Sequence, residues 1–186
     1  MGELTFPDPL PADEVVLLRP WREVDIPAVL ASMNDPLLLE FTSPSENPDP
    51  EAETRGFFVQ QERYRLRGEA LNFAFADPGD DTVVLGGGSV YDVDTGLAKA
   101  AVGYWVAPQA RGRGVATRAV RLMARWAFSE LGTARLELTC SPDNIASQRV
   151  AERSGFVREG VLRSHLPFKG KRRDSVLFSL LPGELP

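Results

Sequence analysis

The stretch Gly103-Tyr104-Trp105-Val106-Ala107-Pro108-Gln109-Ala110-Arg111-Gly112-Arg113-Gly114-Val115-Ala116 contains three kinds of local structure in succession. The apolar run over 98–106 favours a strand, and Pro108 ends it because proline has no backbone N–H to donate. A basic, glycine-rich segment follows, and from Val115 onward apolar residues recur at the spacing of one helical face. This succession predicts a strand, a short loop and an amphipathic helix, and it indicates a mixed α/β fold.

The loop before that helix has the composition of an anion-binding site. The first turn of a helix leaves backbone N–H groups without partners, and the helix dipole adds about half a positive charge there. Gly112 and Gly114 carry no Cβ to keep an anion away from those amides, and Arg111 and Arg113 add positive charge. The pattern predicts a pyrophosphate site over residues 111–116. A plain glycine-rich turn with exposed arginines fits the loop residues by themselves equally well.

The same residues argue against two other phosphate-binding loops. A Walker loop has Lys followed by Ser or Thr after its second glycine, but here Gly114 is followed by Val115. A dinucleotide-binding loop has a third glycine where this chain has Thr117, and no early βαβ unit surrounds the segment. Neither a P-loop nucleotide site nor a Rossmann site is therefore predicted.

Outward from this loop, the chain predicts helices and strands in a mixed order without an internal repeat or a dividing linker. Helices are expected over 26–33, 51–67, 115–127 and 144–153. Asp25 is expected to cap the first of them, and Gly155 to end the last. Strands are expected over 15–20, 71–76, 82–91, 98–106, 136–140, 156–162 and 175–181. Within the third of these, Gly86 to Gly88 are expected to form a bulge or a turn. Residues 42–50 are expected to form a loop, and 1–13 an extended proline-rich arm.

Composition limits the classes of partner. The 186 residues suit one domain, with 43% hydrophobic and 25% charged residues. A net charge of −5 argues against nucleic acid as the main partner. A single cysteine excludes an internal disulfide, and no Cys/His cluster has the spacing of a metal site. The chain has no segment that resembles a secretory signal or a membrane span. We therefore expect a cytoplasmic protein without a membrane partner.

Four motifs together resemble the GCN5-related N-acetyltransferase (GNAT) family over roughly residues 15–181. Gln109–Gly114 is similar to its acetyl-CoA signature Q/R-x-x-G-x-G/A, and Asn144–Ser147 with Ala151–Phe156 is similar to its N-x-x-S … E-K-x-G-F segment. The opening 17–20 with Asp25, and the tail 170–181, resemble the RimJ/RimL branch, which includes N-terminal acetyltransferases of ribosomal proteins. The first two motifs, in this order and at this separation, are the specific ones.

The resemblance implies a fold, a reaction and a cofactor. The fold is α+β, a mostly antiparallel twisted sheet of six to seven strands, splayed in the middle and flanked by about four helices. It would occupy residues 14–182 as a single domain, after the arm over 1–13. The reaction is direct acetyl transfer from acetyl-CoA to a primary amine, without a metal and without a covalent enzyme intermediate.

The resemblance also assigns site residues. The cofactor-binding set comprises backbone groups near Trp105 and Val106, the amides of Arg111, Gly112, Arg113, Gly114, Val115 and Ala116, and the side chains of Asn144 and Ser147. Ser147 could protonate the leaving thiolate, although it could equally face solvent, and Asn144 could equally cap its own helix. Tyr104 is expected to serve in packing, with its hydroxyl within possible reach of the site, and Cys140 to be a small core residue.

Proton removal is where the sequence departs from the family pattern. RimJ/RimL relatives often carry a glutamate two residues before the Gly-Tyr pair, and here that position is Ala101. The candidate bases are Glu137, for which a surface salt bridge is the alternative, and His165, expected in a turn between the last two strands. A water chain, a neutral incoming amine or lost catalysis are the remaining explanations.

The acceptor and the acyl group stay open at this stage. The resemblance admits a protein N-terminus or an amine-bearing small molecule as partner, and a homodimer as an option. The acceptor side is expected from the loop over 40–50, including Glu46, the helix after it, and the turn over 165–171. The alternatives are a CoA-binding regulatory or assembly module without turnover, a ribosome- or RNA-associated protein working through the basic segment 169–173, and a transferase of another acyl group, such as succinyl.

Overall fold

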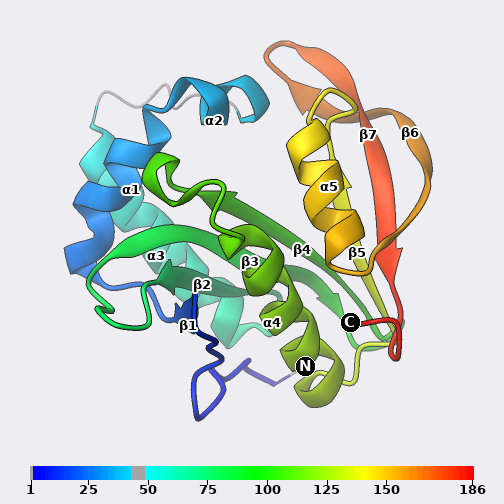
Figure 1. Ribbon diagram of the computed structural model, residues 1–186, viewed down its shortest axis with the longest axis horizontal. Helices are drawn as coiled ribbons and strands as arrows, with labels where there is room; N and C mark the ends of the chain where they lie inside the picture. Colours follow the sequence, from blue (N-terminus) through cyan, green and yellow to red (C-terminus); the bar gives the residue numbers. More distant parts are fainter. Residues whose placement is uncertain (1, 43–48) are drawn as a thin grey trace.

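One twisted sheet of seven strands organises the chain in the computed structural model, which describes residues 2–42 and 49–186 (Figure 1). The strand order is β1-β2-β3-β4-β5-β7-β6, and every neighbouring pair is antiparallel except β4 and β5. The sheet confirms the predicted mostly antiparallel α+β fold. Its strands are β1 (Leu17–Arg19), β2 (Leu71–Ala76), β3 (Val84–Asp94), β4 (Lys99–Val106), β5 (Arg135–Cys140), β6 (Val157–Phe168) and β7 (Lys171–Leu180).

Five α-helices of the described residues flank this sheet, and among them no helix is both long and apolar enough to cross a membrane. They are α1 (Ile26–Met33), α2 (Pro36–Phe41), α3 (Pro50–Leu66), α4 (Val115–Glu130) and α5 (Ile145–Arg153).

The helix that the sequence did not predict is α2, a single short segment. Asp35 accepts a hydrogen bond from the Leu38 amide at 3.0 Å, and Pro36 occupies the first turn, where its missing N–H costs nothing. The predicted loop over 42–50 lies mostly at 43–48, outside the described residues, and so does Glu46.

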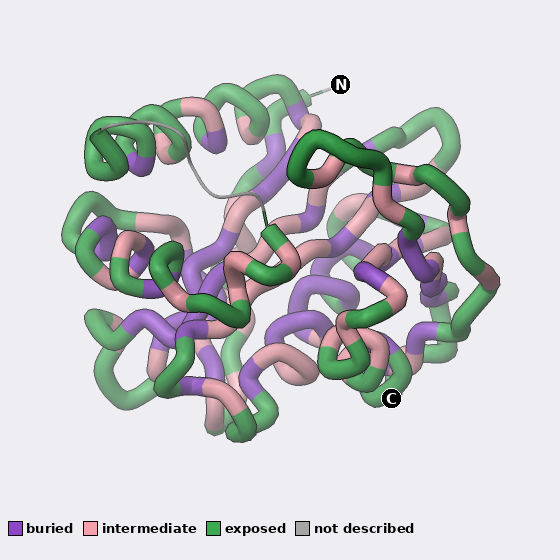
Figure 2. The backbone as a smooth tube through the Cα atoms, turned by 90° about the horizontal axis from the view of Figure 1, so that it is seen from above, coloured by how far each residue is buried: buried purple, intermediate pink, exposed green. Residues whose placement is uncertain are grey.

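The two faces of the sheet carry different helices, as the side chains of β4 show. Trp105 stacks on Trp21, which stacks on Phe58 of α3. The next residue toward the N-terminus, Tyr104, contacts Ser147 of α5. Because successive residues of a strand point to opposite faces, α3 and α5 cover opposite sides of the sheet. Figure 2 shows the buried positions gathered in the interior, with the exposed ones at its margins.

The parallel pairing of β4 with β5 is short. It joins residues 99–101 of β4 to 135–137 of β5 and ends at the pair Ala101 and Glu137. Beyond that pair β5 continues alongside β7, and β4 continues alongside β3. Residues 102–106 of β4 therefore have no strand beside them on the β5 side among the residues described here. The predicted splay in the middle of the sheet is confirmed.

The last two strands form a longer hairpin than the sequence indicated. β6 extends to Phe168 and β7 begins at Lys171, so that only Lys169 and Gly170 form the turn. The expected turn over 165–171 is thus wrong, and His165 lies within β6. The prediction failed because this part of β6 alternates exposed and half-buried residues, which gives it little apolar signal.

Gly86 to Gly88 lie inside β3 and form no turn, and a bulge lies at their start, around Leu85. The register with β2 shifts there, since Phe75 pairs with Gly86 while Ala76 pairs with Val84. A Cβ at Gly87 would lie 2.4 Å from the Trp21 ring and 2.9 Å from the Trp105 indole nitrogen. Glycine is therefore required where the two tryptophan rings lie directly on the strand.

A buried ion pair ties β1 to the first helix. Both side chains have 0% exposure, and the Arg19 guanidinium donates two bonds, of 2.7 and 2.8 Å, to the Asp25 carboxylate. Arg19 also donates to the backbone oxygen of Asp81, and the Arg22 amide donates to Asp25 at 2.8 Å. Asp25 does stand at the cap position of α1, but its side chain makes no cap bond. The predicted cap is therefore corrected to a buried charge partner.

We expect Asp25→Ala to lower the free energy of unfolding by about 3–5 kcal/mol, because it leaves the Arg19 charge buried without a partner. The matched control is Asp81→Ala, which removes the exposed Arg22–Asp81 pair but keeps the Asp81 backbone oxygen, and which should cost less than about 1 kcal/mol. Urea denaturation followed by tryptophan fluorescence measures both. Equal losses in the two variants would contradict this account.

Candidate active site

The predicted anion loop lies at the start of α4 in the required geometry. Gly112 and Gly114 have φ of +73° and +81°, the left-handed region that glycine adopts without strain. Gly114 is the residue before α4, and the Arg118 amide makes the first helical bond, to the Gly114 oxygen. The amides between them have no partner inside the helix, and a Cβ at Gly112 would meet open space. The loop thus offers free donors to an approaching anion.

The two loop arginines are already engaged with carboxylates of other segments. Arg111 contacts Asp35 at 2.5 Å, and Arg113 lies 3.8 Å from Asp77. The Arg111 hydrogen bond holds the pKa of the Asp35 carboxyl below its usual value. Because Asp35 also caps α2, this pair connects the loop to the helix that borders the β6–β7 hairpin. Sequence reasoning missed Asp35; its position just before Pro36 was the available signal for a cap.

The gap between β4 and β5 is lined on the α5 side by a cluster of polar side chains. The Tyr104 hydroxyl donates to Ser147 Oγ at 3.0 Å. Burial raises the pKa of Tyr104 to about 12, although the bond to Ser147 acts in the opposite direction. Burial also raises the pKa of the half-buried Cys140 thiol, against the effects of Ser147 and of the Arg173 charge. Tyr104 therefore keeps its proton at neutral pH, and the cluster can donate protons into the gap.

Asn144 and Ser147 are brought together as the sequence suggested. The Asn144 side-chain oxygen accepts from the Ser147 amide at 3.0 Å, which caps α5. The local reading of Asn144 is confirmed, and cofactor contact by Asn144 stays a prediction. Ser147 makes a side-chain contact and does not simply face solvent. Tyr104, for which packing was expected, is its partner.

On the opposite face of the sheet, Glu137 lies beside the position that lacks the family's glutamate. Ala101 pairs in register with Glu137 on β5 and with Tyr91 on β3, so all three side chains point to one face. Burial is the main cause that raises the pKa of Tyr91, and the nearby Asp92 and Glu137 carboxylates raise it further. A carboxylate is thus present at this point of the sheet, one strand away from where the family pattern puts it.

Glu137 also forms ion pairs, in agreement with the surface salt bridge that the sequence suggested as the alternative to a base. Its carboxylate accepts from Arg135 at 2.9 Å and from Lys99 at 3.4 Å. Arg135 in turn contacts Glu159 at 2.6 Å. Two cations therefore fix the direction of the Glu137 carboxylate, and the salt bridge expected as the alternative to a base is present.

His165, the other candidate base, is not brought to this cluster. It lies on β6, where its backbone oxygen accepts from Arg172 at 2.8 Å. Its ring nitrogen Nδ1 is buried and has no hydrogen-bond partner among the described residues. No hydrogen bond of the described residues joins His165 to Tyr104, Ser147 or Glu137, so the structure offers no support for its role as a base.

The residues present fit a CoA-type cofactor. A diphosphate needs free amides, which residues 112–116 supply, and an extended arm needs a strand edge, which residues 102–106 of β4 supply. The opening at Gly112 leaves room for the phosphates. Within the described ranges, no group of three His, Cys, Asp or Glu residues could hold a metal ion.

Comparison with known proteins gives a consistent result. The family model described as "Acetyltransferase (GNAT) domain" matches residues 16–157. YjcK of Bacillus subtilis is 30% identical over 165 residues, covering 77% of this chain and 91% of YjcK. YdaF of Bacillus subtilis is 38% identical over 96 residues, 52% of each protein. YjcK is described as a probable N-acetyltransferase, and YdaF is described as a ribosomal N-acetyltransferase. The structure of Mycobacterium smegmatis RimJ in complex with CoA-disulfide has a TM-score of 0.81 at 30% identity, covering 95% of this chain and 86% of that one.

The raised pKa of Tyr104 gives a direct spectroscopic prediction. The absorbance of tyrosinate near 295 nm, measured as wild type minus Tyr104→Phe, should rise with a midpoint near pH 12 instead of the ordinary tyrosine value of about 10. Because the folded state holds this proton more tightly than the unfolded state, the stabilisation is complete below pH 10 and is lost as the pH rises toward 12. Circular dichroism along the titration shows whether the protein stays folded. A difference midpoint near pH 10 in folded protein would contradict the assignment.

Proposed function

This chain belongs to the GNAT acetyltransferase family, in its RimJ/RimL-like branch, and on that premise we propose that it transfers an acetyl group directly from acetyl-CoA to a primary amine. The acceptor class is a protein N-terminus or a small amine. The observation that carries the proposal is the position of the gap between β4 and β5, which opens beside the free amides at the start of α4.

Acetyl-CoA would be held by these two features together. The amides of residues 112–116 would bind its pyrophosphate, since the predicted Arg111 amide already donates to the Pro108 oxygen at 3.4 Å. The free edge of β4 at Trp105 and Val106 would bond its extended arm. When bound, it supplies an activated thioester that an amine attacks. The chain's contribution is to align the two reactants, exclude water and manage two protons.

The proton that leaves the amine is assigned to Glu137. Its carboxylate lies in register with Ala101, on the face of the sheet that also carries Trp105. That register supports the replacement of the family's glutamate by a carboxylate from the neighbouring strand. Arg135 and Lys99 fix the direction of the side chain.

The proton that reaches the leaving sulfur is assigned to the pair Ser147 and Tyr104. Ser147 Oγ accepts from the Tyr104 hydroxyl and can give up its own proton at the same time. A pKa of about 12 means that Tyr104 is protonated throughout the physiological range and can renew the proton on Ser147. These two residues lie on the face opposite Glu137, so the two proton transfers occur on different sides of the sheet.

Blocking access to the loop amides tests whether they bind the cofactor. We expect acetyl-CoA to bind in the micromolar range by calorimetry, and Gly112→Trp to abolish binding by filling the open space over the amides. The matched control is Gly132→Trp, since Gly132 also has a left-handed φ (+62°) and open surroundings but lies after the far end of α4. The two variants carry similar backbone strain, of about 1–2 kcal/mol, and the control should bind normally.

The outcome of that titration separates the alternatives. The cofactor site is supported if Gly112→Trp abolishes binding and Gly132→Trp preserves it. Release of free thiol with any member of an amine panel then excludes the alternative of a CoA-binding module without turnover. The same panel run with succinyl-CoA compares acyl groups. No binding of any acyl-CoA to folded, CoA-free protein would sink the proposal.

The assignment of the base is tested separately. We expect Glu137→Gln to lower kcat by about 10²-fold with the affinity for acetyl-CoA unchanged, because general-base catalysis contributes roughly 10²–10⁴-fold. Glu159→Gln is the control, since Glu159 pairs with the same Arg135 from a different strand. It should change kcat by less than about 3-fold. Equal losses in the two variants would assign Glu137 to the ion-pair network alone.

A further inference from the structure

A basic pocket lies beside the proposed reaction site, at the end of the β6–β7 hairpin. Its volume is about 590 Å³, within the usual range of ligand sites, and the loop after β5 forms its other side. Four cationic side chains, Lys169, Lys171, Arg172 and Arg173, line it together with the acidic Asp143 and Asp174. In a chain of net charge −5, this excess of positive charge is of the opposite sign to the whole.

The cations of the pocket have no carboxylate partners. Within the described part of the chain, Lys169, Lys171, Arg172 and Arg173 form no ion pair, whereas Arg111 and Arg113 of the glycine-rich loop both do. Asp174 is occupied by the Ser164 amide at 2.7 Å. Asp143 and Asp174 both keep their negative charge, so four cations against two carboxylates leave an excess of positive charge in the pocket for an anion.

Contacts of the hairpin hold two of these cations in place. Lys169 Nζ donates to the Leu39 oxygen of α2 at 2.7 Å, so the hairpin end and α2 lie side by side (Figure 1). The Arg173 guanidinium lies 3.8 Å over the Phe168 ring and approaches the Phe41 oxygen at 3.4 Å. Its Nε is buried and has no partner among the residues described. A guanidinium fixed over a ring, with a donor still free, is prepared for an incoming acceptor of hydrogen bonds.

The pocket also adjoins the proton-donating cluster. The Arg173 charge reaches the Cys140 thiol, which contacts Ser147. Ser141 and Asp143 of the pocket wall lie in the segment between Cys140 and Asn144. Because Glu137 pairs with Ser179 on β7, the alternation of that strand puts Arg173 on the face that carries Glu137, so an acceptor with its amine at the gap would extend its remaining groups toward the cations.

We propose that this basic pocket binds an anionic group of the acceptor, so that the enzyme selects amines that carry a carboxylate near the reacting nitrogen. The inference rests on the proposed acetyl transfer and names its substrate class. Attraction of this kind steers encounter and orders the acceptor for attack, and it weakens as salt screens the charges. Nucleic acid is disfavoured as the ligand by the acidic chain as a whole.

The test compares two peptides that differ only in charge. One has a free N-terminal alanine followed by Asp-Glu, and the other has Asn-Gln at the same positions. At saturating acetyl-CoA, we expect kcat/KM for the acidic peptide to be about 10-fold higher, with the ratio falling as NaCl increases. The same contrast between free aspartate and asparagine shows whether the anionic acceptor is a peptide or a small molecule.

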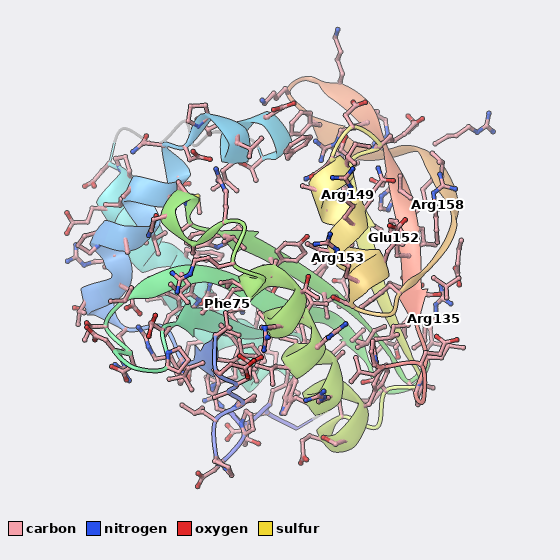
Figure 3. The ribbon with its side chains drawn as sticks, viewed as in Figure 1. Phe75, Arg135, Arg149, Glu152, Arg153 and Arg158 are labelled. Atoms are coloured by element: carbon pink, nitrogen blue, oxygen red, sulfur yellow. The ribbon has the colours of Figure 1, made fainter. Side chains whose placement is uncertain are left out.

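Variants then locate the effect. Lys171 is exposed and makes no hydrogen bond among the described residues, so Lys171→Gln should leave the fold intact, lower kcat/KM for the acidic peptide by about 5-fold, and leave the amide peptide unchanged. Lys171→Glu should reverse the preference. Arg158→Gln is the control: Arg158 is an exposed cation at the other end of β6, away from the pocket (Figure 3). It should alter neither peptide.

A binding measurement keeps this inference separate from the proposed function. Calorimetry of the acidic peptide against CoA-loaded protein needs no turnover, so binding that Lys171→Glu removes would support the pocket even if no amine were acetylated. Equal rates and equal binding of the two peptides would overturn the proposal while acetyl transfer stands. Binding of a single-stranded RNA that Lys171→Glu abolishes, without any difference between the peptides, would overturn it in favour of nucleic acid.

Discussion

The site depends on where the pairing of β4 with β5 ends. The two strands are bonded over residues 99–101 and 135–137 and then separate. Had the pairing continued, the edge of β4 would be satisfied by β5, and Tyr104 would be closed off from any ligand. Because it ends at Ala101, backbone groups of β4 remain available directly before the loop that begins α4. The gap, the free strand edge and the loop amides are thus consequences of one short parallel register.

The strand at this gap has two faces with different chemistry. Trp105 packs among the aromatic rings of the α3 side, and that packing requires glycine at position 87. Tyr104 points to the α5 side, where it donates to Ser147. The twofold alternation of a strand therefore separates the surface of Trp105, which we propose faces the acceptor, from that of Tyr104, which we propose supplies a proton. The register of β5 adds Glu137 to the first surface and Cys140 to the second.

The glycine-rich loop, the two amphipathic helices after it and the family were predictable because local rules govern them: helical periodicity, cap residues and the conformational freedom of glycine. The gap itself entered the sequence reading only through the family resemblance. The β6–β7 hairpin was misread because its residues alternate weakly between exposed and half-buried. Asp25 was read as a cap, since a cap is a local role, whereas its actual partner is Arg19 on β1. Asp35 and the contact of Arg173 with Phe41 were missed because these contacts join segments far apart in the chain.

The sequence by itself determined the order of the elements except α2, the position of a glycine-rich loop at a helix start and the family to which the chain belongs. Each of these depends on residues within a few positions of one another. Only the tertiary structure decided that Glu137 lies opposite Ala101, that Tyr104 reaches Ser147, and that four unpaired cations gather beside them. Strand register and the contacts between distant segments fix those relations, and neither leaves a periodic pattern in one stretch of sequence.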